Sequence, residues 1–314
     1  MLSAEIGSRS VRKRRLRLLA LASLVMVAVV WGSTYVVVKD VTRDVSPMDF
    51  LAARFLIATA ALAVLRPRAV FRLDRSQLIR GVLLGLALGA AYIVMTYGQQ
   101  YTSSSMSGFI IGMAVVLTPL AAGLLLKQRI TPATWTAGAI ATAGLGVMSL
   151  HGFSIGLGEG LTLLSALLLA LHIVAVGEWS TSRDAYGLAV VQLGVVGLLC
   201  LVLGGSDGIV LPAEREFWLP VIGLAVIATA AAYLLQTWAQ TRVSASTVAV
   251  VLTLEPVFAG VFGILVDGDT MTPRIVIGAI LVVGAMYLTE LRSPAQDPEP
   301  AAEIRAEERR CVPT

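Results

Sequence analysis

The chain has 314 residues, of which 57% are hydrophobic and only 14% are charged, and its mean hydropathy is +0.83. An ordinary soluble domain carries about 25% charged residues, so this chain has too few polar side chains to cover a water-exposed surface. The composition therefore excludes a soluble globular protein and predicts an integral membrane protein. The formal net charge of +4 comes from basic loops and tails, and we expect no nucleic-acid partner.

Ten apolar runs, most of them about long enough for a transmembrane helix, follow one another along the chain. Short connections that contain Pro, Gly, Ser or charged residues separate them. The pattern predicts an all-α polytopic membrane protein with ten transmembrane helices. The predicted helices cover residues 16–38, 50–65, 78–97, 104–126, 132–150, 157–177, 186–203, 217–239, 244–266 and 273–291.

The distribution of basic residues predicts the orientation. With an even number of spans both chain ends lie on one side of the membrane, and that side holds most of the 24 Lys and Arg residues. Because basic loops stay in the cytoplasm, we expect both termini to be cytoplasmic and the protein to lie in the cytoplasmic (inner) membrane. Residues 1–15 are predicted to form a basic tail, and residues 292–314, rich in proline and mixed charges, a disordered tail.

An internal repeat divides the chain. When the sequence is shifted by 141 residues, the third apolar run falls on the eighth. Seven of the sixteen positions 90–105 are then identical to positions 231–246, among them Tyr92 and Tyr233. Five helices per repeat is an odd number, so the two halves insert with opposite topology. Inverted repeats of this kind are typical of secondary transporters.

Polar residues in both repeats form a stripe on one helix face, at a spacing of i, i+4 and i+7. A polar face cannot point into lipid, so it should turn inward. We interpret the stripe as the wall of a substrate cavity, although interhelical hydrogen bonding explains the glutamines near the helix ends better. The stripe comprises Tyr92, Thr96 and Gln99 in the first repeat and Tyr233, Gln236, Thr237 and Gln240 in the second.

Glu255 is the most informative single residue, because it lies near the middle of the predicted ninth helix. An acid there costs about 2.5–3.5 kcal/mol to insert. One interpretation is a proton-linked or cation-pairing group in the solute pathway. The other is a neutral or hydrogen-bonded acid that braces a kink at Pro256, whose ring removes a backbone donor. The sequence leaves both open.

Three further residues are candidates for substrate binding. Arg54 lies about one turn inside the external end of its helix, where it either extends to the membrane interface or pairs with Glu255 or a substrate carboxylate. His172 is the one histidine within a predicted span and is a candidate for lining the cavity. Trp31 belongs to a polar and aromatic group in the first helix, where it lines the cavity or anchors the helix at the interface.

The sequence contains no motif for catalysis or for binding a metal. It has no P-loop, no His-Glu-x-x-His and no nucleophile elbow. A lone His172 without a second ligand at suitable spacing does not make a metal site, and Cys200 and Cys311 are a poor pair for a disulfide. We therefore expect no catalytic residue, no cofactor, no metal and no enzymatic activity.

Several short motifs resemble the EamA-type families of the drug/metabolite transporter superfamily, which have ten helices. They are Trp31-Gly-Ser-Thr-Tyr35, Arg54-Phe55, Tyr97-Gly-Gln-Gln-Tyr-Thr-Ser-Ser-Ser105, Leu254-Glu255-Pro256 and Gly268-Asp269. The resemblance covers about residues 16–291 and implies two EamA-like five-helix repeats, at residues 16–150 and 151–291. The chain departs from the family pattern in three places. It has Gln128 where the family has an acid, Asp269 in place of Glu, and Ala114-Val115 in place of a first Glu-Pro pair.

The resemblance and the repeat together predict a secondary transporter that works by alternating access. We expect its substrate to be a small organic metabolite, amino-acid-like or amphipathic, and we expect export because the resembling families more often export than import. The partners are then this small molecule, the lipid bilayer and, if transport is coupled, protons. The alternatives are a passive facilitator without ion coupling and, with less support, an intramembrane enzyme. The sequence gives no indication of the oligomeric state.

Overall fold

The structure is a computed structural model that describes residues 2–127, 130–151, 154–179, 185–204, 212, 214–240, 248 and 251–292. The described residues form helices, joined in one place by a short antiparallel pair of strands, β1 (Leu150–His151) and β2 (Ser154–Ile155). The helices of the first half are α1 (Leu2–Val41), α2 (Pro47–Leu65), η1 (Val70–Arg72), α3 (Arg75–Gln99), α4 (Ser104–Gly112), α5 (Ala114–Leu125) and α6 (Pro132–Ser149). Those of the second half are α7 (Leu157–Trp179), α8 (Ala185–Gly204), α9 (Arg215–Gly223), the π-helix η3 (Leu224–Ala231), α10 (Ala232–Gln240), α12 (Glu255–Leu265) and α13 (Pro273–Arg292).

Seven helical segments in the described part of the chain are long and apolar enough to cross a membrane. They are Arg15–Val41, Pro47–Leu65, Arg75–Gln99, Ser104–Leu125, Leu157–Trp179, Ala185–Gly204 and Arg215–Gln236. Shorter apolar helices cover Glu255–Leu265 and Pro273–Leu288. The all-helical, multi-pass membrane class is thus confirmed, whereas ten spans remain a prediction. The start of the predicted ninth span and the tail beyond residue 292 fall largely outside the described residues.

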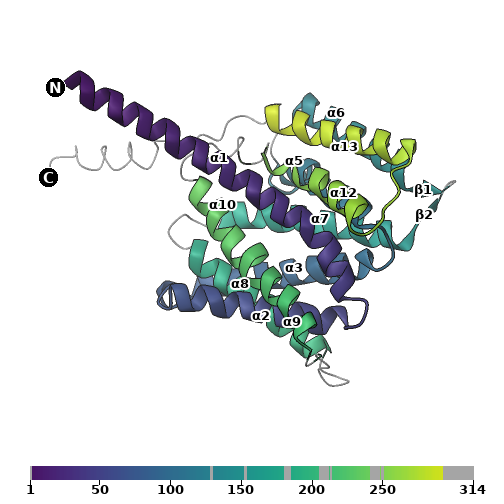
Figure 1. The fold of residues 1–314 in the computed structure, drawn as a ribbon, viewed down its shortest axis with the longest axis horizontal. Coiled ribbons are helices and arrows are strands. Elements are labelled where there is room, and N and C mark those ends of the chain that lie inside the picture. The colour runs from purple at the N-terminus through teal and green to yellow at the C-terminus, as the bar shows by residue number, and fades with distance from the viewer. Residues whose placement is uncertain are drawn as a thin grey trace.

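The helix ends carry the local signals that end or begin a helix. Ser46 caps α2, its hydroxyl accepting from the backbone of Met48, and Pro47 follows at the first helical position. Asp74 and Gln77 form a reciprocal capping box at the start of α3. No such signal marks a helix start near residue 16, where the sequence predicts the first helix to begin. Instead, α1 continues back through the predicted basic tail and projects from the bundle (Figure 1).

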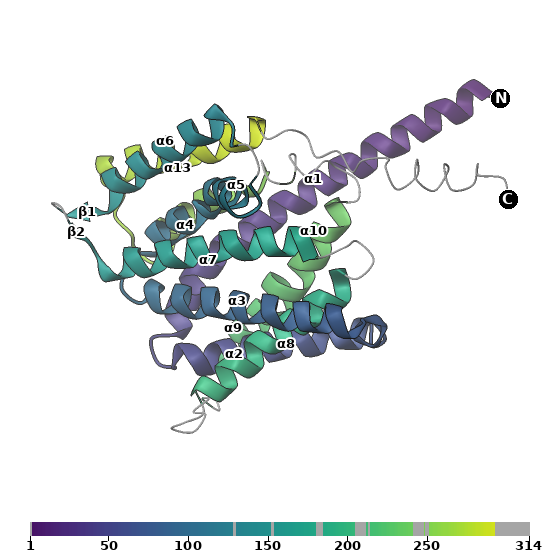
Figure 2. The ribbon, with the colours of Figure 1, turned by 180° about the vertical axis from the view of Figure 1, so that it is seen from behind.

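The two halves of the chain interlock, because helices of the first half pack mainly on helices of the second. The packed pairs are α6 with α13, α3 with α7 and α8, α2 with α8, and α12 with both α1 and α4. Figure 1 shows α6 and α13 as a pair at one side of the molecule and α2, α8 and α9 at the opposite side, with α1 crossing between them. The reverse view in Figure 2 shows α7 and α3 running side by side between these two groups. A site at the centre is therefore built from both halves.

The repeat seen in the sequence recurs in the backbone at the same spacing of 141 residues. The helix breaks at Met113, between α4 and α5, and again at Leu254, just before α12. In each case a backbone bond to the third residue back replaces the regular one, from Met113 N to Ile110 O and from Leu254 N to Val251 O. The break is thus a property of the repeat.

The exits of these two helices also correspond. The two residues with positive φ in the described part of the chain are Lys127, at 54°, and Gly268, at 71°, which are again 141 residues apart. Beyond them, Thr131 accepts from the backbone of Thr134, and Thr272 accepts from that of Ile275, so α6 and α13 begin with the same cap.

Candidate functional site

Six polar or aromatic side chains from both halves of the chain meet in the interior. The indole Nε1 of Trp31 donates to the carbonyl oxygen of Ala228 in η3, over 2.8 Å. One turn further along α1, the Tyr35 hydroxyl donates to Glu255 Oε1 over 3.0 Å. We call this group the central cluster, and it consists of Trp31, Tyr35, Arg54, Tyr92, Thr229 and Glu255.

Arg54 is buried, with 4% of its surface exposed, so it does not extend to the aqueous interface. Its Nε donates to Thr229 Oγ1 over 3.3 Å. Its Cζ lies 5.5 Å from the centre of the Phe55 ring and 5.7 Å from that of Tyr92, and these two rings contact each other edge to face. Among the described residues no ion pair joins Arg54 to Glu255.

Glu255 is the first residue of α12, so its carboxylate lies at the positive end of a helix dipole as well as beside Tyr35. Tyr92 lies within electrostatic range of both Arg54 and Glu255. The predicted kink is present at this position. Proline is not its sole cause, however, because the matching break at Met113 has Val115 where the second repeat has Pro256.

The other predicted site residues are not members of the central cluster. Tyr233 and Gln236 are half-buried on α10, and the side chain of Thr237 lies outside the described residues. Thr96 is buried, and its hydroxyl donates to the carbonyl of Tyr92 in its own helix, so it is engaged with the backbone. His172 of α7 contacts Gln192 of α8, with 2.7 Å between Nε2 and Oε1, instead of joining the central cluster.

A second polar group, which the sequence did not single out, lies where α1 and α12 end and α4 begins. Asp267 accepts from Lys39 Nζ over 2.7 Å, from Ser104 Oγ over 2.9 Å and from Arg43 Nη2 over 3.4 Å. We call these four residues the Asp267 cluster. Burial raises the pKa of Asp267, but the hydrogen bonds from Lys39 and Ser104 and the two cationic charges outweigh this, so the pKa lies below its usual range.

The sequence did carry a signal for this cluster. Lys39 and Arg43 are two basic residues close together just beyond the predicted end of the first helix. Asp267 and Asp269 follow the ninth helix, on the side of the membrane that is otherwise poor in basic residues. In the structure Asp269 also contributes, since its Oδ2 accepts from the backbone of Ser105 over 2.8 Å.

Small residues hold α12 tightly between α1 and α4. A methyl group at Gly32 of α1 would lie 2.8 Å from the backbone nitrogen of Ala259, and one at Gly108 of α4 would overlap the Ala259 side chain. At the end of α12, a methyl group on Gly263 would overlap Ser105 Oγ and Asp269 Oδ2. The close packing at Gly32 and Gly108 holds Glu255 in a fixed position relative to Tyr35. The close packing at Gly263 brings α12 and α4 together next to the Asp267 cluster.

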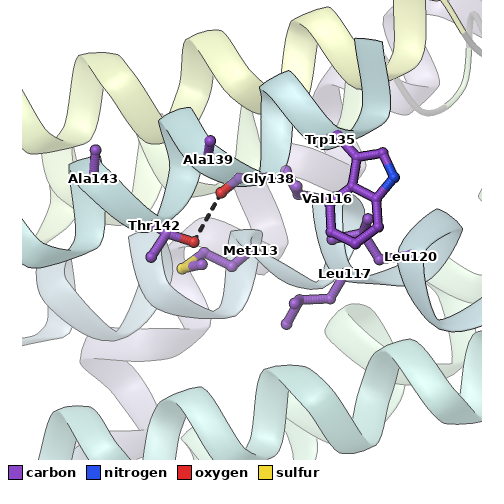
Figure 3. A pocket seen from close by; sticks show the side chains of 9 residues that line it. All are labelled: Met113, Val116, Leu117, Leu120, Trp135, Gly138, Ala139, Thr142 and Ala143. Carbon is purple, nitrogen blue, oxygen red and sulfur yellow. Dashed lines mark hydrogen bonds between the residues drawn. The ribbon is translucent and has the colours of Figure 1, made fainter. Parts of the chain in front are cut away.

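An apolar groove of about 610 Å³ lies between α5 and α6, away from the predicted site residues (Figure 3). The Thr142 hydroxyl, its main polar group, donates to the carbonyl of Gly138 in the same helix. No charged side chain lines the groove, which suits lipid chains better than a polar solute. The lining residues are Met113, Val116, Leu117, Leu120, Trp135, Gly138, Ala139, Thr142 and Ala143.

Comparison with known proteins gives consistent results. The chain matches the model of the EamA-like transporter family over residues 18–150 and again over residues 156–291. An uncharacterized transporter of Archaeoglobus fulgidus is 30% identical over 277 residues, which cover 88% of this chain and 87% of that protein. The uncharacterized transporter YoaV of Bacillus subtilis is 21% identical over 283 residues, which cover 84% and 94%. A crystal structure with 17% identity shares the fold, with a TM-score of 0.61 over 85% of this chain and 95% of that chain.

Proposed function

The chain belongs to the EamA-like transporter family and is a multi-pass membrane transporter, and from this premise we propose that it is a secondary transporter that exports a small organic metabolite across the cytoplasmic membrane. The observation that carries the proposal is the central cluster. It gathers a cation, an acid and hydroxyl groups from α1, α2, α3, η3 and α12, which come from both repeats. Polar groups are retained inside a membrane protein chiefly where solutes or ions pass.

Alternating access requires that the site be closed from one side at a time. The Asp267 cluster is suited to close one end, because its ion pairs and the tight packing at Gly263 join α1, α4 and α12. The basic-residue count assigns this end to the external side, with both termini cytoplasmic. On this proposal the structure is a conformation closed to the outside, and export requires the ion pairs of Asp267 with Lys39 and Arg43 to separate.

Glu255 is the group that we propose takes up and releases a coupling proton. Within the described residues it forms no ion pair, and its hydrogen-bond donor is the neutral hydroxyl of Tyr35. A buried acid with such a partner changes its charge at a lower energetic cost than one paired with a cation. A passive facilitator with the same cluster would use Glu255 only to brace the break before α12.

The function is tested in two steps. Comparative metabolite profiling of deletion and overexpression cells should show one or more small organic compounds retained by the deletion strain and enriched outside the overexpressing strain. The purified protein in liposomes should then move the same compound, and an imposed pH gradient should drive its accumulation. If no compound moves in liposomes, the transporter proposal fails. If movement is unaffected by the pH gradient, the facilitator replaces the coupled carrier.

A further inference from the structure

Arg54 is a buried cation for which the described residues supply no anion. None of their ion pairs includes it, and Glu255 is engaged by Tyr35 instead. Asp49, the acid of the same helix, lies in the first turn of α2 beside Gly204. An uncompensated charge inside a membrane protein is costly, so its presence calls for a partner that the described residues do not provide.

The guanidinium group is held at one edge, and its other edge has no hydrogen-bond partner among the described residues. Its Nε donates to Thr229, and the Phe55 and Tyr92 rings lie beside it. Neither Nη1 nor Nη2 donates to a described residue, although Arg54 as a whole is only 4% exposed. The free pair of terminal N–H groups forms the planar fork that fits the two oxygens of a carboxylate.

We propose that Arg54 binds the carboxylate of the transported solute, so that the substrate class is small organic monocarboxylates. The inference rests on the proposed transport function and narrows its substrate. Arg54 is the one cation of the central cluster, and Glu255 is neutral while it holds the proposed coupling proton. The cluster in that form balances a single negative charge, whereas a phosphate monoester carries close to two. Tyr92 and Trp31, which are both half-buried, provide aromatic surface for the rest of the molecule.

A purely structural role for Arg54 predicts something different. If the residue only pins η3 through Thr229, removal of either partner should have the same effect. Thr229→Val removes the acceptor of Nε but leaves the terminal fork of Arg54 intact. Arg66→Gln is a second control, because Arg66 follows α2 and also lies over a tyrosine ring, that of Tyr186 at 5.0 Å, outside the central cluster.

The test measures ligand-induced thermal stabilisation of the purified full-length protein in nanodiscs. The probes are small monocarboxylates, each paired with its carboxamide and with the corresponding amine. We expect at least one carboxylate to stabilise the protein and its carboxamide to bind about ten-fold more weakly or worse, since hydrogen bonds to charged groups are the stronger ones. Arg54→Gln should lose this preference, and Arg54→Lys should retain part of it. Thr229→Val should weaken binding but keep the preference, because the terminal fork of Arg54 remains. Arg66→Gln, outside the cluster, should stay within about two-fold of the parent.

Three results overturn the inference: carboxamides or amines that bind as well as carboxylates, an Arg54→Gln variant that keeps the preference, or no carboxylate that stabilises the protein. Should Arg54→Gln not fold, Arg54→Lys decides, because an unchanged preference there excludes bidentate binding. Failure of the transport proposal is distinguishable from these outcomes. A neutral or cationic compound that is moved by the protein in liposomes overturns the carboxylate assignment and leaves the transporter standing.

Discussion

The third helices of the two repeats have similar sequences but different backbones. Seven of sixteen positions from residue 90 are identical at a shift of 141, yet α3 is a regular α-helix from Arg75 to Gln99. Its counterpart is divided into α9, the π-helix η3 and α10. The π-helix corresponds to residues 83–90, nearly all of which lie before the identical positions, and five of the eight residue pairs differ there. The different backbone therefore goes with different residues and different packing partners.

The partners differ because of a row of glycines in α3. Gly81, Gly85 and Gly89 lie against the valines and leucines of α8, and a methyl group on Gly85 would lie 2.7 Å from Val195 Cβ. At the corresponding positions the second repeat has Ile222, Val226 and Ala230. Without glycines, this helix cannot approach a neighbour closely along its length. It bulges instead, and the bulge is held by Trp31 at Ala228 and by Arg54 at Thr229.

The fourth helices show the converse relation, with the same backbone but different chemistry. Both repeats break at corresponding residues, Met113 and Leu254. The residue after the break is Ala114 in the first repeat and Glu255 in the second. The first repeat thus provides the tightly packed scaffold, and the second provides the irregular backbone and the acid of the central cluster.

The largest effect is expected where the glycine row is disrupted. Gly85→Val places a branched side chain 2.7 Å from Val195 Cβ and 3.0 Å from the Gln192 carbonyl oxygen. Overpacking of this kind costs about 1–3 kcal/mol or more, and the backbone contact leaves little room for relaxation. We expect a large drop in the yield of monodisperse protein by size-exclusion chromatography. Val226→Leu is the control, because Val226 is exposed, and it should change stability by less than about 0.5 kcal/mol. Equal losses from both variants would mean that α3 and η3 are packed alike.

Much of this comparison could be predicted from the sequence. The shift of 141 residues predicts the matching breaks, turns and caps, because each is set by local residues. The π-helix could not be predicted, since residues 83–90, at the corresponding positions of the first repeat, are also mainly small and apolar and are α-helical in α3. The partners of Arg54 and Glu255 were also out of reach, because Thr229 and Tyr35 lie 175 and 220 residues away along the chain. Periodicity predicts which face of a helix turns inward, but it does not predict which residues of other helices that face contacts.

The next effect concerns the acid that only the second repeat has. If Glu255 carries the coupling proton, Glu255→Gln should abolish accumulation driven by a pH gradient in liposomes and leave exchange of substrate for substrate intact. Glutamine keeps the volume and an acceptor for the Tyr35 hydroxyl, so the fold should be retained. Ala114→Ser is the matched control in the first repeat and should leave coupling unchanged. Unchanged pH-driven accumulation in Glu255→Gln would exclude the coupling role.

A smaller effect is expected at the Asp267 cluster. The first repeat has no such cluster where α5 ends, since Leu126 occupies the position that corresponds to Asp267. The pKa of Asp267 is lowered in the folded protein, because the hydrogen bonds from Lys39 and Ser104 outweigh burial. Its contribution to closure is therefore present above the unfolded pKa of an aspartate, about 3.9, and is lost as the pH falls through the lower folded value. Between pH 5 and 8 closure should not change with pH.

Asp267→Asn should mimic the acid state at neutral pH. The measurement is the rate at which an impermeant thiol reagent labels Ser107→Cys, a buried position on α4, in a background without Cys200 and Cys311. We expect Asp267→Asn to raise the external labelling rate by up to about ten-fold, since the ion pairs with Lys39 and Arg43 are both lost. Asp40→Asn is the control, because Asp40 is exposed and pairs only with Arg43 in the described structure. Labelling that is equally fast in the parent would show that the cluster does not close this end.

The smallest effect compares the two turns with positive φ, at Lys127 and Gly268. Lys127 adopts φ 54° with a side chain, and a left-handed residue other than glycine costs about 1–2 kcal/mol. Lys127 is exposed, so Lys127→Gly should remove this strain and lose little contact, although glycine makes the unfolded chain more flexible. We expect a net stabilisation of about 0.5–1 kcal/mol, measured as a melting temperature raised by about 1–2 °C.

Gly268→Ala should act in the opposite direction by a similar amount. A methyl group there meets no atom within 4 Å, so only its φ of 71° opposes the change. If Lys127→Gly lowers the melting temperature, the Lys127 side chain stabilises its turn. The two turns would then have the same backbone geometry, but the positive φ would not destabilise the turn at Lys127.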